Sequence, residues 1–248
     1  MGAGVIAPTR ALYAARLDRL YDALLDDYGP QHWWPAEGPP ETVALEVCVG
    51  AILVQHARWE SAAAALRRLR DADALSVDAL ATLPLDDLGA LVRGAGTYRA
   101  KARTLGSFAE SVQAGPGGTI EGFLAGDAET VRRRCLDVWG VGPETADAIV
   151  LYAGRRPTFV VDAYARRLFA RLGCELPEGY EAARQALLAV TDHDVGRLGE
   201  WHALIVAHGK ARCRARSPRC EGCPLVADCP AGRAMLGAHC SPVAARRD

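Results

Sequence analysis

Four cysteines in the last third of the chain have the spacing of a metal or cluster site. Six, two and five residues separate Cys213, Cys220, Cys223 and Cys229. Thiolates at such short intervals can hold a zinc ion or a [4Fe–4S] cluster. Disulfides are the weakest alternative, because the chain begins without the long apolar run of an export signal.

Basic residues surround this cysteine loop. No acidic residue occurs from Trp201 to Cys220. A basic loop fixed by a metal group would suit contacts to phosphates, which position a protein on nucleic acid without reading its sequence. The candidate contacts are Lys210, Arg212, Arg214 and Arg216.

A glycine-rich turn opens a helix in the middle of the chain. Gly140-Val141-Gly142 follows one helical segment, and Pro143 begins the next. The glycines allow a tight turn, and the free N–H groups at the start of the second helix favour an anion such as a phosphate. The pattern predicts a helix-hairpin-helix that grips a DNA backbone; an ordinary helical corner is the alternative.

An aspartate lies about twenty residues beyond this turn. Asp162 follows the extended segment 157–161 and directly precedes a helix. Aspartate is among the commonest helix caps, so a cap is the simplest interpretation of this residue taken alone. The same position keeps the carboxylate ionised, and an ionised carboxylate near a sugar C1′ can stabilise an oxocarbenium-like transition state.

The elements that must position these residues are helical. Apolar residues recur at helical spacing over eleven segments: 10–25, 42–54, 59–70, 76–83, 86–93, 98–114, 127–138, 143–154, 163–172, 179–191 and 195–209. The apolar run 42–54 is expected to be a buried central helix. With 248 residues, 50% of them hydrophobic, and a net charge of −1, the chain is too apolar for disorder and long enough for two domains. It lacks a membrane-length apolar stretch, so we expect a soluble, cytoplasmic protein.

In their order along the chain, the turn, the Val161-Asp162 pair and the cysteine spacing resemble the endonuclease III, or HhH-GPD, superfamily of DNA glycosylases. The resemblance covers roughly residues 30–230. It implies an all-α fold with a DNA cleft between two domains: a six-helix domain over 36–156 with the hairpin, and a cluster domain formed by 1–35 and 157–248. It also implies a monomer that acts on double-stranded DNA containing damaged bases.

The resemblance assigns roles to individual residues. Asp162 would be the catalytic carboxylate, and the four cysteines would hold a [4Fe–4S] cluster rather than zinc. Gln55 would fill the gap left by a flipped nucleotide; alone it could be a surface amide. The DNA backbone would contact Gly140, Val141, Gly142 and Thr145.

One departure from the family bears on the reaction. Bifunctional members carry a lysine two residues after the second glycine of the turn, where this chain has Glu144. The chain has only two lysines, Lys101 and Lys210, and neither lies in that motif. Because strand cleavage through a Schiff base requires an amine, we expect a monofunctional glycosylase with absent or weak lyase activity.

An aromatic segment near the N-terminus indicates the substrate. Trp33, Trp34, Pro35 and Trp59 resemble the base-pocket residues of the 3-methyladenine DNA glycosylase III branch. Indole rings bind a cationic, alkylated purine by cation–π attraction, although such a pair of tryptophans could simply be core. The hypothesis is therefore excision of an alkylated purine; the alternatives are oxidised pyrimidines, mismatched uracil or thymine, or a non-catalytic iron–sulfur DNA-binding protein.

Overall fold

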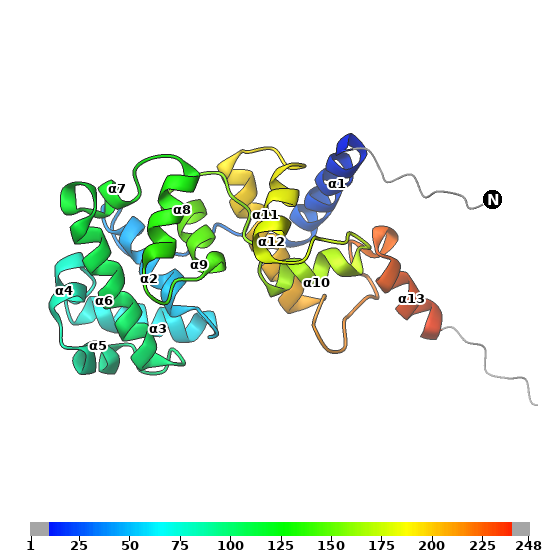
Figure 1. The fold of residues 1–248 in the computed structure, drawn as a ribbon. Helices are drawn as coiled ribbons and strands as arrows, with labels where there is room; N and C mark the ends of the chain where they lie inside the picture. Colours follow the sequence, from blue (N-terminus) through cyan, green and yellow to red (C-terminus); the bar gives the residue numbers. More distant parts are fainter. Residues whose placement is uncertain (1–9, 240–248) are drawn as a thin grey trace, which may run out of the picture. The chain divides into compact units, whose positions relative to one another are not determined.

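The computed structural model describes residues 10–239, and over this range every regular element is a helix (Figure 1). The prediction of an all-α fold is thereby confirmed. No helix in this range is both long and apolar enough to cross a membrane. Cys240 and the segment 1–9 lie outside the described residues.

The chain divides into two compact units. One is continuous and spans Trp33–Val160; the other joins the segment that ends at His32 to the segment that begins at Val161.

The continuous unit is built around a single buried helix. In α2 (Val43–Leu53), every residue from Leu45 to Leu53 is buried, as expected from its unbroken apolar sequence. The other elements of this unit are α3 (Trp59–Asp71), α4 (Val77–Thr82), α5 (Leu85–Leu91), α6 (Tyr98–Ala114), α7 (Ile120–Phe123), α8 (Ala128–Asp137) and α9 (Pro143–Ala148), with the 3₁₀ turn η1 (Pro116–Gly118) and the π-helical turn η2 (Ile149–Ala153). Of these, α3, α6, α7, α9 and η2 pack against α2.

The discontinuous unit packs helices from both ends of the chain around Trp201. Its elements are α1 (Arg10–Tyr28), α10 (Ala163–Arg171), α11 (Tyr180–Leu188), α12 (Val195–Ala211), η3 (Val226–Asp228) and α13 (Pro230–His239). The ring of Trp201 lies 5.7 Å from that of Tyr21 and 6.3 Å from that of Phe169, measured between centroids. The amphipathic helix α1 thus buries its apolar face against α12.

Candidate functional site

Asp162 is the N-cap of α10. Its Oδ1 accepts a hydrogen bond from the Ala165 N–H at 2.7 Å, so the capping interpretation is confirmed. The second oxygen, Oδ2, lies 3.6 Å from Nε2 of His202 on α12. Both side chains are largely buried, at 11% and 8% exposure, so the carboxylate is held by a helix terminus on one side and by an imidazole on the other. The sequence reasoning missed His202.

The glycine turn joins α8 to α9. Gly140 has φ +82°, a conformation that glycine adopts without strain, and a Cβ at this position would collide with the Thr104 hydroxyl. Gly142 is the N-cap of α9, is exposed, and faces open space. Pro143 begins α9 and has no N–H, so it leaves no unsatisfied donor at this first helical position.

A buried ion pair joins the two helices of the hairpin. Nε of Arg132 on α8 donates to Oδ1 of Asp147 on α9 at 3.1 Å, with side-chain exposures of 11% and 0%. The Thr158 hydroxyl donates to the same oxygen at 2.7 Å. The carboxylate therefore ties α8, α9 and the segment that leads to Asp162 together.

The Gln55 side chain is bound to the hairpin turn. Gln55 lies in the turn after α2, and its Nε2 donates to the Gly140 carbonyl at 3.1 Å and to the Thr145 hydroxyl at 2.8 Å. Three residues that the sequence singled out separately are thus in direct contact. A buried lysine binds the end of α2, just before Gln55. The Lys101 Nζ donates to the Leu53 carbonyl at 2.5 Å and to the Ala95 carbonyl.

The predicted aromatic residues form one cluster. The Trp34 ring lies 5.3 Å from Trp59 and 5.9 Å from Trp33, both edge to face, and Pro35 beside them is exposed. Tyr152 completes the cluster at 5.4 Å from Trp34; it was not expected from the sequence. The Trp34 indole nitrogen is buried without a hydrogen-bond partner, and Gly50 of α2 leaves room for its ring.

The four cysteines of the C-terminal segment are free thiols that line one pocket, together with His208 and Met235. Burial is the main factor that raises the pKa of Cys220 and of Cys223. Repulsion from the neighbouring thiols raises it further. Among the described residues, no group of three or more His, Cys, Asp and Glu side chains is arranged to hold a metal ion.

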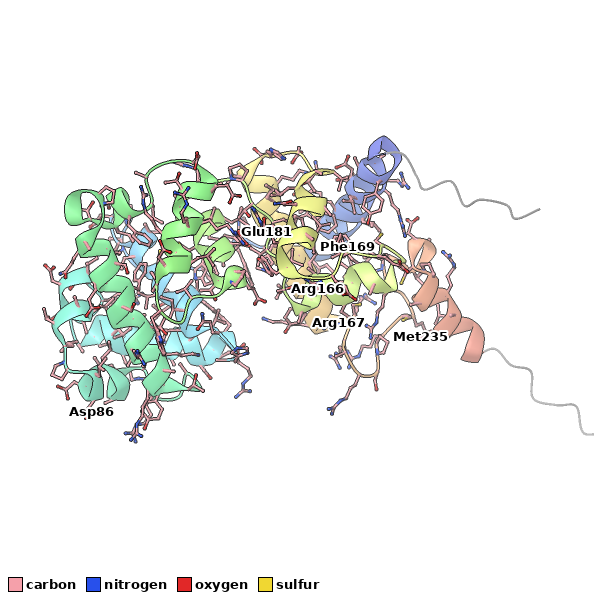
Figure 2. All side chains as sticks on the ribbon, viewed as in Figure 1. Asp86, Arg166, Arg167, Phe169, Glu181 and Met235 are labelled. Carbon is pink, nitrogen blue, oxygen red and sulfur yellow. The ribbon has the colours of Figure 1, made fainter. Side chains whose placement is uncertain are left out.

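Helix α10 supports this cysteine pocket. Arg167 donates from Nε to the Cys213 carbonyl at 2.7 Å, and Arg171 donates from Nη1 to the Cys213 sulfur at 3.2 Å. Arg167 lies on α10, and Met235, another residue that lines the pocket, lies on α13 (Figure 2). The helix that begins at Asp162 thus ends against the cysteine segment.

A histidine between the cysteines and α1 is buried. The His208 Nδ1 lies 3.0 Å from the Tyr28 hydroxyl, and its Nε2 lies 3.9 Å from the Cys223 sulfur. Burial is the main factor that lowers the pKa of His208, to about 4.

The basic residues of the cysteine loop differ in exposure. Lys210, Arg214 and Arg216 are exposed, whereas Arg212 is half-buried with its Nε 3.6 Å from Oδ2 of Asp27. The first three are therefore the better placed of the predicted phosphate contacts.

Comparison with known proteins gives consistent matches. Residues 49–192 match the HhH-GPD superfamily of base excision DNA repair proteins. A protein of Methanocaldococcus jannaschii that is provisionally named a DNA repair glycosylase is 38% identical over 214 residues, which cover 85% of this chain and 94% of that protein.

Two solved structures are also similar. The Helicobacter pylori 3-methyladenine DNA glycosylase, bound to 1,N6-ethenoadenine, is 26% identical with a TM-score of 0.64, over 81% of this chain and 97% of that one. An endonuclease III–DNA complex has the same fold, with a TM-score of 0.76 at 20% identity over 90% of this chain and 98% of that one.

Proposed function

The chain belongs to the HhH-GPD superfamily of base excision DNA repair proteins and is a DNA glycosylase; on that premise we propose that it is monofunctional and releases an alkylated purine such as 3-methyladenine. The observation that carries the substrate class is the aromatic cluster of Trp33, Trp34, Trp59 and Tyr152. Electron-rich rings attract a cationic base. The likeness to the Helicobacter pylori 3-methyladenine glycosylase supports the same choice.

The proposed chemistry is hydrolysis of the N-glycosidic bond. Alkylation places positive charge on the purine, so the base leaves with little help from an acid. The chief requirement is then an anion near the sugar as positive charge develops at C1′, a role suited to Asp162. Its buried position, with one oxygen fixed by the Ala165 N–H, orients the carboxylate before substrate arrives.

The lysines support hydrolysis without strand cleavage. Glu144 is exposed in the first turn of α9, where bifunctional members have lysine. Lys101 is 2% exposed, and its amine is occupied by two carbonyls. Glu144 has no amine, and the amine of Lys101 is occupied. The second lysine, the exposed Lys210, lies outside the hairpin motif, so no lysine stands where bifunctional members carry theirs.

For the DNA interface, we propose the hairpin residues Gly140, Val141, Gly142 and Thr145 as backbone contacts, with Lys210, Arg214 and Arg216 as further phosphate contacts. Gln55 would enter the space left by the flipped nucleotide after leaving its partners Gly140 and Thr145.

We propose that Cys213, Cys220, Cys223 and Cys229 hold a [4Fe–4S] cluster. The four thiols line one pocket, which supports a shared ligand. When bound, such a cluster supplies cross-links that fix the C-terminal segment. The cluster assignment is tested by the iron and sulfide content of protein purified without oxygen. The visible absorbance band of an iron–sulfur cluster is measured on the same sample. Zinc without sulfide would contradict the assignment.

The decisive experiment measures base release from duplexes that each carry one lesion: 3-methyladenine or a stable analogue, uracil opposite guanine, or thymine glycol. We expect release from the alkylated duplex, strand breaks only after alkali, and no covalent adduct with borohydride. Release from thymine glycol or mismatched uracil alone would contradict the substrate class. Strand cleavage without alkali would contradict the monofunctional assignment.

A pair of substitutions tests the aromatic cluster. Trp34→Phe retains an aromatic ring, whereas Trp34→Ala removes it. We expect Trp34→Phe to lower base release modestly and Trp34→Ala to lower it strongly, with duplex affinity unchanged. Equal rates for wild type and Trp34→Ala would place base recognition elsewhere.

A further inference from the structure

Three exposed arginines near the start of α6 lie over aromatic rings. The guanidinium carbon of Arg103 is 3.9 Å from the centroid of the Trp139 ring. Those of Arg93 and Arg99 are 5.4 and 5.8 Å from the centroid of Tyr98. We call Arg93, Arg99 and Arg103 the arginine strip. A guanidinium stacked on a ring keeps the N–H groups at its edge available for a planar anion.

The arginine strip has no acidic partner. No aspartate or glutamate occurs between Asp87 and Glu110 in the sequence. Within residues 10–239, none of the three arginines forms an ion pair, whereas other arginines of the same unit do; Arg70, for example, binds Glu37 and Glu46. Three unneutralised cations on one surface repel one another, and an anionic ligand would relieve that repulsion.

The strip is continuous with the hairpin turn. The Trp139 N–H, one residue before Gly140, donates to the Ser107 hydroxyl of α6 at 3.2 Å. Thr104 of α6 lies directly against Gly140. Arg103 therefore stands beside the turn that we assign to a DNA phosphate, and Trp139 is 43% exposed between them.

We propose that the arginine strip binds phosphates of duplex DNA adjacent to the one held by the hairpin turn. This inference rests on the proposed function and extends its DNA interface to a second element, α6. Trp139 would act as the platform that holds the Arg103 guanidinium edge-on to the phosphate, with less side-chain entropy to lose on binding.

The far end of the same surface sets a limit to the interface. Glu110 lines one pocket with Arg103 and Trp139 but stands seven residues further along α6, about 10 Å at 1.5 Å per residue. A carboxylate there repels phosphate, so the DNA path would turn away before that point.

The test uses the salt dependence of binding to an undamaged duplex. Each phosphate contact adds about 0.9 to the slope of log affinity against log salt concentration. We expect Arg103→Gln to reduce the slope by about 1 and to weaken binding alike for different sequences. Arg67→Gln is the matched control, because it removes the same charge from an exposed arginine that already faces Glu37 at 3.6 Å; its slope should equal that of the wild type.

A second variant tests the platform. Trp139→Leu keeps an apolar side chain but removes the ring face, so we expect weaker binding than wild type but stronger than Arg103→Gln. If Trp139→Leu is poorly folded by circular dichroism, Arg103→Glu replaces it, and its affinity should fall below that of Arg103→Gln.

The outcomes separate the two proposals. Slopes that are equal for Arg103→Gln, Arg67→Gln and wild type would overturn the arginine strip while leaving base release intact. A wild-type protein without salt-dependent duplex binding would instead overturn the proposed function, and the strip with it.

Discussion

His202 Nε2 lies 3.6 Å from Asp162 Oδ2, while Asp162 Oδ1 accepts the Ala165 N–H at 2.7 Å. The two oxygens of one carboxylate are thus held by different elements, α12 and the first turn of α10. The carboxylate therefore has a structural role and a proposed chemical role, and substitutions can separate them.

At Asp162, asparagine and alanine should differ in stability but not in catalysis. Asparagine is as good a cap as aspartate, whereas alanine loses the bond to the Ala165 N–H at a cost of about 1 kcal/mol. We expect both variants to lose base release and only Asp162→Ala to lose stability in urea denaturation. Base release by Asp162→Asn at the wild-type rate would remove Asp162 from the mechanism.

His202 is predicted to position the carboxylate. His202→Phe should lower the rate of base release about tenfold, equivalent to about 1.4 kcal/mol, with duplex affinity unchanged. His202→Gln retains a polar donor and should recover most of the rate. The discriminating measurement is the pH profile of base release, which should change shape in both variants. If both variants keep the wild-type profile, His202 only fills space.

The buried pair in the hairpin should be costly to break. Asp147→Asn removes the charge of a fully buried carboxylate that pairs with Arg132 and accepts from Thr158, and we expect a loss of about 3 kcal/mol in the free energy of unfolding. Arg67→Met, which breaks an exposed pair with Glu37, should change stability by less than about 1 kcal/mol. Similar losses in the two variants would show that the buried Arg132–Asp147 pair contributes no more to the free energy of unfolding than an exposed pair.

Lys101 should make stability depend on pH. Burial lowers its pKa from 10.5 to about 8. Between these values the unfolded chain keeps the proton and the folded chain releases it, so stability rises with pH, by up to about 1.4 kcal/mol per unit. The buried thiol of Cys135, with its pKa raised to about 12, opposes this trend. The measurement is therefore the difference in unfolding free energy between wild type and Lys101→Met, taken at about pH 7.5 and at about pH 9.5. We expect the wild type to gain stability relative to Lys101→Met at the higher pH. A constant difference would show that Lys101 does not titrate in this range.

Local sequence signals predicted most of the helices. The apolar run predicted at 42–54 is observed as α2, Val43–Leu53, because a buried helix needs no polar face. The single helix expected at 143–154 is interrupted by the π-helical turn η2, since one extra residue per turn leaves the apolar pattern almost unchanged. Helix α13 was missed because its ten residues follow the last ligand-type cysteine without an apolar run.

At the site, the sequence predicted residues but not their partners. The position of Asp162 before a helix predicted the cap, and the family resemblance supplied its catalytic role and the grouping of Trp33, Trp34 and Trp59. His202, Tyr152 and Arg103 were missed because only the packing of distant helices brings them to Asp162, Trp34 and Trp139. Contacts between residues far apart in the chain produce no repeating pattern in a single sequence, so the sequence could not predict them.

The division of the chain into a continuous and a discontinuous unit has a consequence for biosynthesis. The unit Trp33–Val160 is inserted between the two halves of the other, so all of its contacts become available once Val160 has left the ribosome. Helix α1 must wait for α12 and for the Asp228 carbonyl that Arg16 binds at 3.0 Å. At 5–20 residues per second, its apolar face stays uncovered for roughly ten seconds or more, so the nascent chain passes through a state in which chaperones can bind α1.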